Sequence, residues 1–158
     1  MAIINLKKVN VGKGFTLVEV MIVVATIAML AAIVIPGFMR IRENAQNSCY
    51  AADIRVATTA FIQYSIDFGH YPPDANPAVM PTGMDEYLKK VAWTKPDVLG
   101  GKWDWDNQQF GIKAGVSSYQ PTAALTQLQR YDAMIDDGDL STGQFRARTS
   151  GYITVIEE

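Results

Sequence analysis

The sequence contains few of the residues on which most catalytic sites depend. It has one cysteine, Cys49, and one histidine, His70, which lie far apart and provide no nucleophile and base pair. A single cysteine also excludes an internal disulfide. The lysine after Gly100-Gly101 lacks the spacing of a phosphate-binding loop. We therefore predict that the protein is not an enzyme, that Cys49 packs as a small apolar residue, and that His70 is a loop residue.

Positive charge is also scarce beyond the first 14 residues. The formal net charge is −2, and residues 1–14 carry three lysines and no acid. Without them, 11 basic and 16 acidic residues remain. A modestly acidic chain lacks the basic patch that drives electrostatic binding to nucleic acid. No nucleic-acid partner is predicted.

What the sequence does have is a long apolar run, residues 15–38, with Glu19 as its only charged residue. As a helix rising about 1.5 Å per residue, this run would exceed the roughly 30 Å hydrocarbon core of a bilayer. The apolar region of a secretory signal is shorter, about 7–15 residues. We predict a membrane-spanning helix that the mature protein retains. A carboxylate at the bilayer centre costs roughly 2.5–3.5 kcal/mol, so Glu19 calls for a functional reason.

The segment Gly14-Phe15-Thr16-Leu17-Val18-Glu19-Val20-Met21-Ile22 resembles the processing site of type IV pilins and type II secretion pseudopilins. This resemblance implies a leader peptide at 1–14, cleavage by a prepilin peptidase between Gly14 and Phe15, and N-methylation of Phe15. It also implies that Glu19 of one subunit lies near that amine of its neighbour in a filament. The alternative is that Glu19 snorkels to the lipid headgroups. Residues 64–72 resemble the place where pseudopilin helices leave the head.

Pro36-Gly37 interrupts the apolar run. Because proline lacks a backbone donor and clashes with the preceding turn, we predict a helix kink at Pro36 and Gly37; a helix end at the membrane surface is the alternative. Helical periodicity then resumes, so an amphipathic continuation is predicted over 39–68, capped by Gly69. The residues expected to face inward form a stripe: Ile41, Ala45, Cys49, Ala52, Val56 and Ala60.

Residues 69–158 are enough for one small globular domain. We predict a short helix from Asp85 to about Val91, a second helix from Thr122 to about Asp137, and a last strand over 151–156. In the second helix, Leu125, Leu128 and Tyr131 are expected to face inward. With the resemblance, these elements predict an α+β fold, in which a long kinked N-terminal helix packs its outer half on a small antiparallel β-sheet.

A hairpin is predicted between strands 102–106 and 109–113, with both tryptophans on one face of the first strand and both aspartates on the other. Paired carboxylates at Asp104 and Asp106 invite a general-acid or metal role. A half-buried strand with one wet face explains the same pattern, and we prefer it.

A second group of acids surrounds Gly138: Asp132, Asp136, Asp137 and Asp139. It does not fit the EF-hand loop, because Ala133 and Ile135 would occupy the first and third ligand positions. We predict no metal and no cofactor, and expect calcium removal to leave the head stable. An irregular calcium loop remains the alternative, since some pseudopilin heads bind calcium.

The resemblance predicts a structural filament subunit, a pseudopilin of a type II secretion-like system. The alternatives are a type IV pilus pilin for adhesion, motility or DNA uptake, and a membrane-anchored binding module that never polymerises. The expected partners are copies of itself, other pilins, an inner-membrane assembly platform, the prepilin peptidase and membrane lipid. The N-terminus is expected in the cytoplasm and the head in the periplasm.

Overall fold

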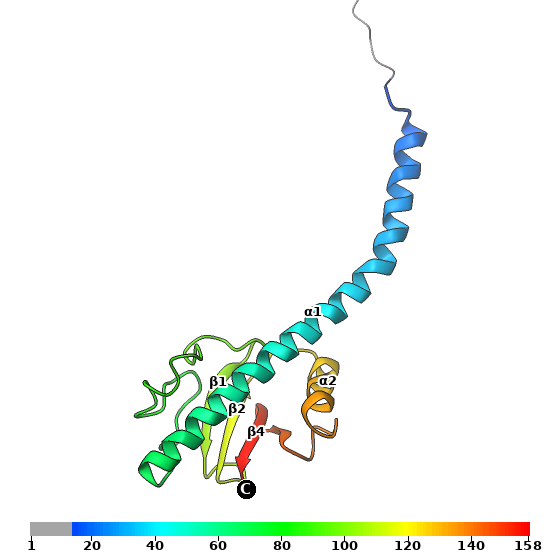
Figure 1. Ribbon diagram of the computed structural model, residues 1–158. Helices are drawn as coiled ribbons and strands as arrows, with labels where there is room; N and C mark the ends of the chain where they lie inside the picture. The colour runs from blue at the N-terminus through cyan, green and yellow to red at the C-terminus, as the bar shows by residue number, and fades with distance from the viewer. Residues whose placement is uncertain (1–13) are drawn as a thin grey trace, which may run out of the picture. The chain divides into compact units, whose positions relative to one another are not determined.

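The computed structural model describes residues 14–158 (Figure 1). In chain order the elements are α1 (Leu17–Phe68), β1 (Lys102–Asn107), β2 (Ala114–Tyr119), α2 (Leu125–Ile135), β3 (Phe145–Arg148) and β4 (Gly151–Glu157). The strands form one antiparallel sheet in the order β1-β2-β4-β3. A long N-terminal helix with a small antiparallel sheet confirms the predicted α+β class. Except for Gly14, the predicted leader lies outside the described residues.

Internal contacts divide the chain between Met39 and Arg40. The first unit contains an apolar stretch of α1 that could span a membrane by length and composition. Its best 18-residue window has a mean hydropathy of 2.8, and none of it is buried. The helix is unbroken through Pro36 and Gly37. The kink expected in an assembled filament stays a prediction.

In the second unit, the half of α1 after Met39 packs on the sheet through aromatic side chains. Tyr50, Phe61 and Trp105 are fully buried. The Phe61 ring stacks on Trp105 at 3.7 Å between centroids, and Tyr50 stacks on Trp103 at 5.5 Å. In Figure 1 this part of α1 crosses over β1, β2 and β4, with α2 beside it. These stacked rings are the centre of the hydrophobic core.

The predicted inward stripe of α1 was wrong in all but one position. Ala60 is buried, whereas the other five residues are exposed; we call these five the 41–56 stripe: Ile41, Ala45, Cys49, Ala52 and Val56. The prediction that Cys49 packs inside the subunit fails with them. The physical reason is area, because each aromatic ring on the opposite side of α1 buries more apolar surface than an alanine or a valine.

The first predicted strand of the hairpin is confirmed and the second is wrong. Residues 108–113 are a loop, since Gln108, Phe110 and Gly111 have φ of 56°, 50° and 80°, which no strand accommodates. The partner strand is β2, which begins at Ala114 and pairs Trp105 with Val116. Both tryptophans of β1 lie on one face of the strand, as predicted, and in the structure that face packs against α1. The face with the aspartates is not wet, because both carboxylates are buried.

The remaining elements were predicted unevenly. Phe68 ends α1, and the Gly69 cap is confirmed by its φ of +76° and by its N–H, which donates to the Ser65 carbonyl at 2.8 Å. Residues 85–91 form turns instead of a helix. In α2, Leu128 and Tyr131 are buried as expected, but Leu125 is exposed. Strand β3 was not predicted.

Candidate functional site

The start of α1 carries the predicted processing and assembly residues. The Thr16 N–H and hydroxyl both donate to Glu19 Oε2, at 2.8 and 2.7 Å. The Glu19 N–H in turn donates to the Thr16 hydroxyl at 3.2 Å. This reciprocal arrangement is a capping box, in which Thr16 is the N-cap and Glu19 satisfies its backbone. Glu19 therefore has a structural partner within its own chain.

The capping box was readable in the sequence and was missed. Thr16-Leu17-Val18-Glu19 has the T-x-x-E spacing, placed directly before an apolar helix. Phe15, one residue earlier, is 85% exposed. Cleavage after Gly14 would thus free an amine at the same helix end as the carboxylate. The predicted roles of Gly14, Phe15 and Glu19, and of Pro36 and Gly37, stay predictions.

The acidic group around Gly138 is partly assembled in the fold. Asp132, Asp136 and Asp137 each offer a carboxylate oxygen, and these oxygens lie within 4.8 Å of one another. Asp132 is fully buried, and neither of its oxygens has a hydrogen-bond partner among the described residues. Burial, followed by the charges of Asp137 and Asp136, raises the pKa of Asp132. Buried, clustered carboxylate oxygens are the ligand type that hard divalent cations prefer.

The other acids accept hydrogen bonds from backbone N–H groups of the loop that follows α2. Asp136 accepts the N–H of Gln144, and Asp137 accepts the N–H of Asp139 at 2.8 Å. Asp139, the fourth predicted candidate, is not in the cluster. Its carboxylate accepts the Ser141 hydroxyl at 2.6 Å, and the Ser141 hydrogen bonds lower the pKa of Asp139.

The other candidate acids, Asp104 and Asp106, form an ion-pair network on the face of the sheet away from α1. Arg148 from β3 lies 2.5 Å from Asp104 and 3.5 Å from Asp106, and all three side chains are nearly buried. Burial, together with the charge of Asp106, raises the pKa of Asp104 to about 6 despite Arg148. The arginine also donates to Ser117 at 2.9 Å. Because Arg148 already compensates these acids, the pair functions as a structural network and not as an open metal site.

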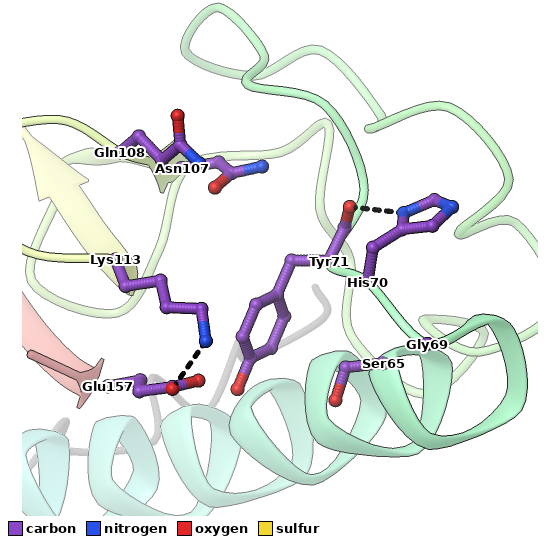
Figure 2. Close-up of a pocket in the computed structure, with 8 residues that line it drawn as sticks. All are labelled: Ser65, Gly69, His70, Tyr71, Asn107, Gln108, Lys113 and Glu157. Carbon is purple, nitrogen blue, oxygen red and sulfur yellow. Dashed lines mark hydrogen bonds and ion pairs between the residues drawn. The ribbon is translucent and has the colours of Figure 1, made fainter.

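A polar pocket of about 290 Å³ lies at the end of α1 (Figure 2). Lys113 bonds Glu157 at 2.6 Å, which raises the pKa of the lysine and lowers the pKa of the glutamate. His70 is exposed, as predicted for a loop residue, and its Nδ1 lies 2.8 Å from the Tyr71 carbonyl. In Figure 2 the His70 ring points away from the ion pair. The pocket's two charges neutralise each other, and its lining shows no nucleophile poised beside a base.

Comparison of the sequence with known proteins identifies its family. A type II secretion system core protein G of Pseudomonas aeruginosa is 33% identical over 98 residues, covering 52% of this chain and 69% of that protein. The chain therefore belongs to the family of type IV pilins and type II secretion pseudopilins. A core protein G of Escherichia coli is 38% identical over 60 residues, covering 41% of its length. The type IV wide pilus major component PilA4 of Thermus thermophilus is 41% identical over 60 residues, covering 46% of its length.

No protein-family profile and no solved structure matches the chain. Membership in this family makes the protein a pilin or pseudopilin type of filament subunit. The one helix of residues 14–158 that is long and apolar enough to span a membrane lies near the N-terminus, which fits a single-pass protein of the inner membrane. Relatives in secretion and pilus systems also fit assembly with other pilins.

Proposed function

We propose that this protein is a pseudopilin of a type II secretion-like system and has a structural role without catalysis. It loses residues 1–14 to a prepilin peptidase, acquires a methylated Phe15, and waits in the inner membrane with its N-terminus in the cytoplasm and its head in the periplasm. An assembly platform then adds it to a filament. The secretion assignment is supported by the relatives compared above, because two of the three are type II secretion core proteins G and the longest of these alignments covers 69% of the Pseudomonas protein.

The observation that carries this proposal is apolar surface with no partner among residues 14–158. The apolar window of α1 is unburied, and the 41–56 stripe continues apolar exposure onto the half of α1 that carries the head. Lipid can cover the first of these. The second belongs to the unit that holds the globular domain, where exposed apolar residues at helical spacing favour packing against another helix. A second copy of α1 supplies such a helix.

Cys49 provides a direct test because it lies in the 41–56 stripe and is exposed. We expect its thiol to react with maleimide in detergent-solubilised subunits and to be strongly protected in sheared filaments. The matched control is Cys49→Ser combined with Thr149→Cys, which moves the thiol to the exposed β3–β4 turn. That thiol should react in both states. Equal reactivity of Cys49 in subunits and filaments would exclude the stripe from the interface, and the absence of filaments would favour a non-polymerising anchored module.

Processing and system need separate tests. Mass spectrometry of the mature protein should give an N-terminus at Phe15 carrying one added methyl group; an N-terminus beyond residue 30 would overturn the proposed processing. For the system, deletion of the chain in its host should abolish release of secreted proteins and leave surface pili intact. Loss of the pili with normal secretion would favour the type IV pilus alternative.

We further propose that the acidic cluster of Asp132, Asp136 and Asp137 holds a divalent cation, for which calcium is the test ion. This proposal replaces the expectation from ligand spacing that no metal is bound. The support is Asp132, a fully buried carboxylate that has no hydrogen-bond partner in the described part of the chain and lies in a cluster with Asp136 and Asp137. Without a cation, a buried unpaired charge is costly, so Asp132→Asn should raise the melting temperature. With a cation, the same change removes a ligand and should lower it.

The experiment therefore compares thermal melting of wild type and Asp132→Asn, each in calcium and in chelator. We expect calcium to stabilise the wild type, Asp132→Asn to melt lower than wild type in calcium, and chelator to have little effect on the variant. Asp139→Asn is the matched control, since Asp139 bonds Ser141 outside the cluster. A wild-type melting temperature indifferent to chelator would refute the cation.

A further inference from the structure

A cavity of about 400 Å³, partly open to solvent, lies between α1 and α2 in the globular unit. Arg55 and Thr58 line it from α1, Tyr131 and Met134 line it from α2, and Thr154 lines it from β4. We call it the α1–α2 cavity. Neither the filament role nor the acidic cluster makes use of it.

Three buried hydroxyl groups in this cavity lack a partner among residues 14–158: those of Thr58, Tyr131 and Thr154. Tyr131 is 0% and Thr154 is 2% exposed. Buried hydroxyls are almost always hydrogen-bonded, because an unmade bond at such a group is costly. Three of them around one cavity indicate that the partner comes from outside the chain.

The lining also indicates the chemistry of that partner. Burial raises the pKa of Tyr131, so its hydroxyl remains a proton donor at neutral pH. The Arg55 guanidinium takes part in no salt bridge within the described part of the chain, and no carboxylate lines the cavity. Hydroxyl donors beside a free guanidinium favour an oxyanion that accepts several hydrogen bonds.

The other lining residues are two polar ones, Thr59 and Gln144, and four apolar ones, Ala51, Ile54, Met134 and Ile135. Water would satisfy the hydroxyls and could accept from Arg55, but it brings no negative charge to the guanidinium and no apolar surface to the four apolar residues. A carboxylate on a short aliphatic stem uses both. We propose that the α1–α2 cavity binds the carboxylate of a short aliphatic acid, with Arg55 as its cationic partner and the Tyr131 hydroxyl as a donor.

The test uses the full chain in detergent micelles, labelled with ¹³C at the methionine methyl groups, because Met134 lines the cavity. Titration with glutarate or butyrate should shift the Met134 methyl signal to saturation. Butyramide, the neutral analogue of butyrate, should bind far more weakly.

Two variants connect the shift to the proposed contacts. Arg55→Gln should weaken binding roughly tenfold or more, as expected for loss of a charge-assisted bond. Tyr131→Phe, which keeps the ring packed, should also weaken it. Arg42→Gln is the matched control, since Arg42 is exposed on the same helix outside the cavity. No saturable shift, equal binding of butyramide, or full affinity in Arg55→Gln would each overturn the proposal.

Two sources could supply the carboxylate: a free acid or an acidic side chain of a neighbouring copy. The same signal measured in filaments distinguishes them. A Met134 shift that appears on assembly without added acid, and is absent in Arg55→Gln filaments, assigns the cavity to a side chain of a neighbouring copy. An unchanged response to butyrate in filaments assigns it to a free acid.

Discussion

Glu19 has two roles to separate: it caps α1 within the chain, and it is proposed to pair with the Phe15 amine of a neighbour. Replacing Glu19 by glutamine tests the second role alone, whereas replacing it by alanine removes both. In the chain, Glu19 Oε2 accepts both the N–H and the hydroxyl of Thr16. Glutamine can still accept these bonds, since a capping box admits either residue. It cannot pair with the Phe15 amine of a neighbour as a charge. Alanine loses the cap and the charge together.

The two contributions differ enough in size to be told apart. Loss of a helix cap costs about 0.5–2 kcal/mol. A pair of unit charges 4 Å apart is worth roughly 4 kcal/mol at an effective dielectric near 20. That is nearly a thousandfold in the constant for adding a subunit, at about 1.4 kcal/mol per factor of ten. We therefore expect Glu19→Gln to abolish filaments almost as completely as Glu19→Ala.

The assay compares membrane fractionation with the yield of sheared filaments. Insertion should be normal in both variants, because each makes the span less charged. Thr16→Val is the control for the cap, since it removes the hydroxyl and leaves the carboxylate; it should assemble with only a modest loss. Wild-type filament yield from Glu19→Gln would falsify the charge pair and leave the capping box as the role of Glu19.

Three further expectations follow from the head and the helix. The pKa of Asp104 is raised to about 6, so the folded state binds a proton more tightly than the unfolded chain, and stability measured in chelator should fall as pH rises from about 4 to 6; Asp104→Asn should flatten that slope. Gly143→Ala should lower the melting temperature more than Gly111→Ala, because both have positive φ but only at Gly143 would the new Cβ meet a carboxylate, that of Asp136. A filament map should show a bend or a break in the helix at Pro36, and a straight helix there would contradict the expected kink.

Local patterns predicted the parts of this fold that depend on neighbours in sequence. The alternation in β1 placed Trp103 and Trp105 on the core side, and Gly69 marked the end of α1, because both signals act over a few residues. The choice of face on α1 failed for a different reason. Two apolar stripes share this helix, and periodicity alone does not say which one meets the sheet. Only the stacking of aromatic rings with β1 decides it.

The residues that complete the sites were harder still to predict from the sequence. Arg148 lies 44 positions from Asp104, and nothing local marks the two as partners. The fold brings them together because β3 pairs with β4, β4 with β2 and β2 with β1, which is a property of the sheet order. The acidic loop shows the converse. Its sequence does not have the ligand spacing of an EF-hand loop, yet the carboxylate of the buried α2 residue Asp132 lies beside those of Asp136 and Asp137. Spacing rules for contiguous loops do not describe a cluster shared between a helix and a loop.

The two faces of α1 in the globular unit also explain how one helix can serve folding and assembly. The aromatic face packs within the subunit, since Tyr50 and Phe61 are fully buried against the sheet. The 41–56 stripe consists of small or aliphatic residues, which leave a shallow surface that another helix can approach closely. Large rings there would favour collapse onto the chain's own sheet, and small residues on the aromatic face would leave the sheet uncovered. The division of residue size between the faces would therefore keep the proposed assembly surface exposed for a second copy.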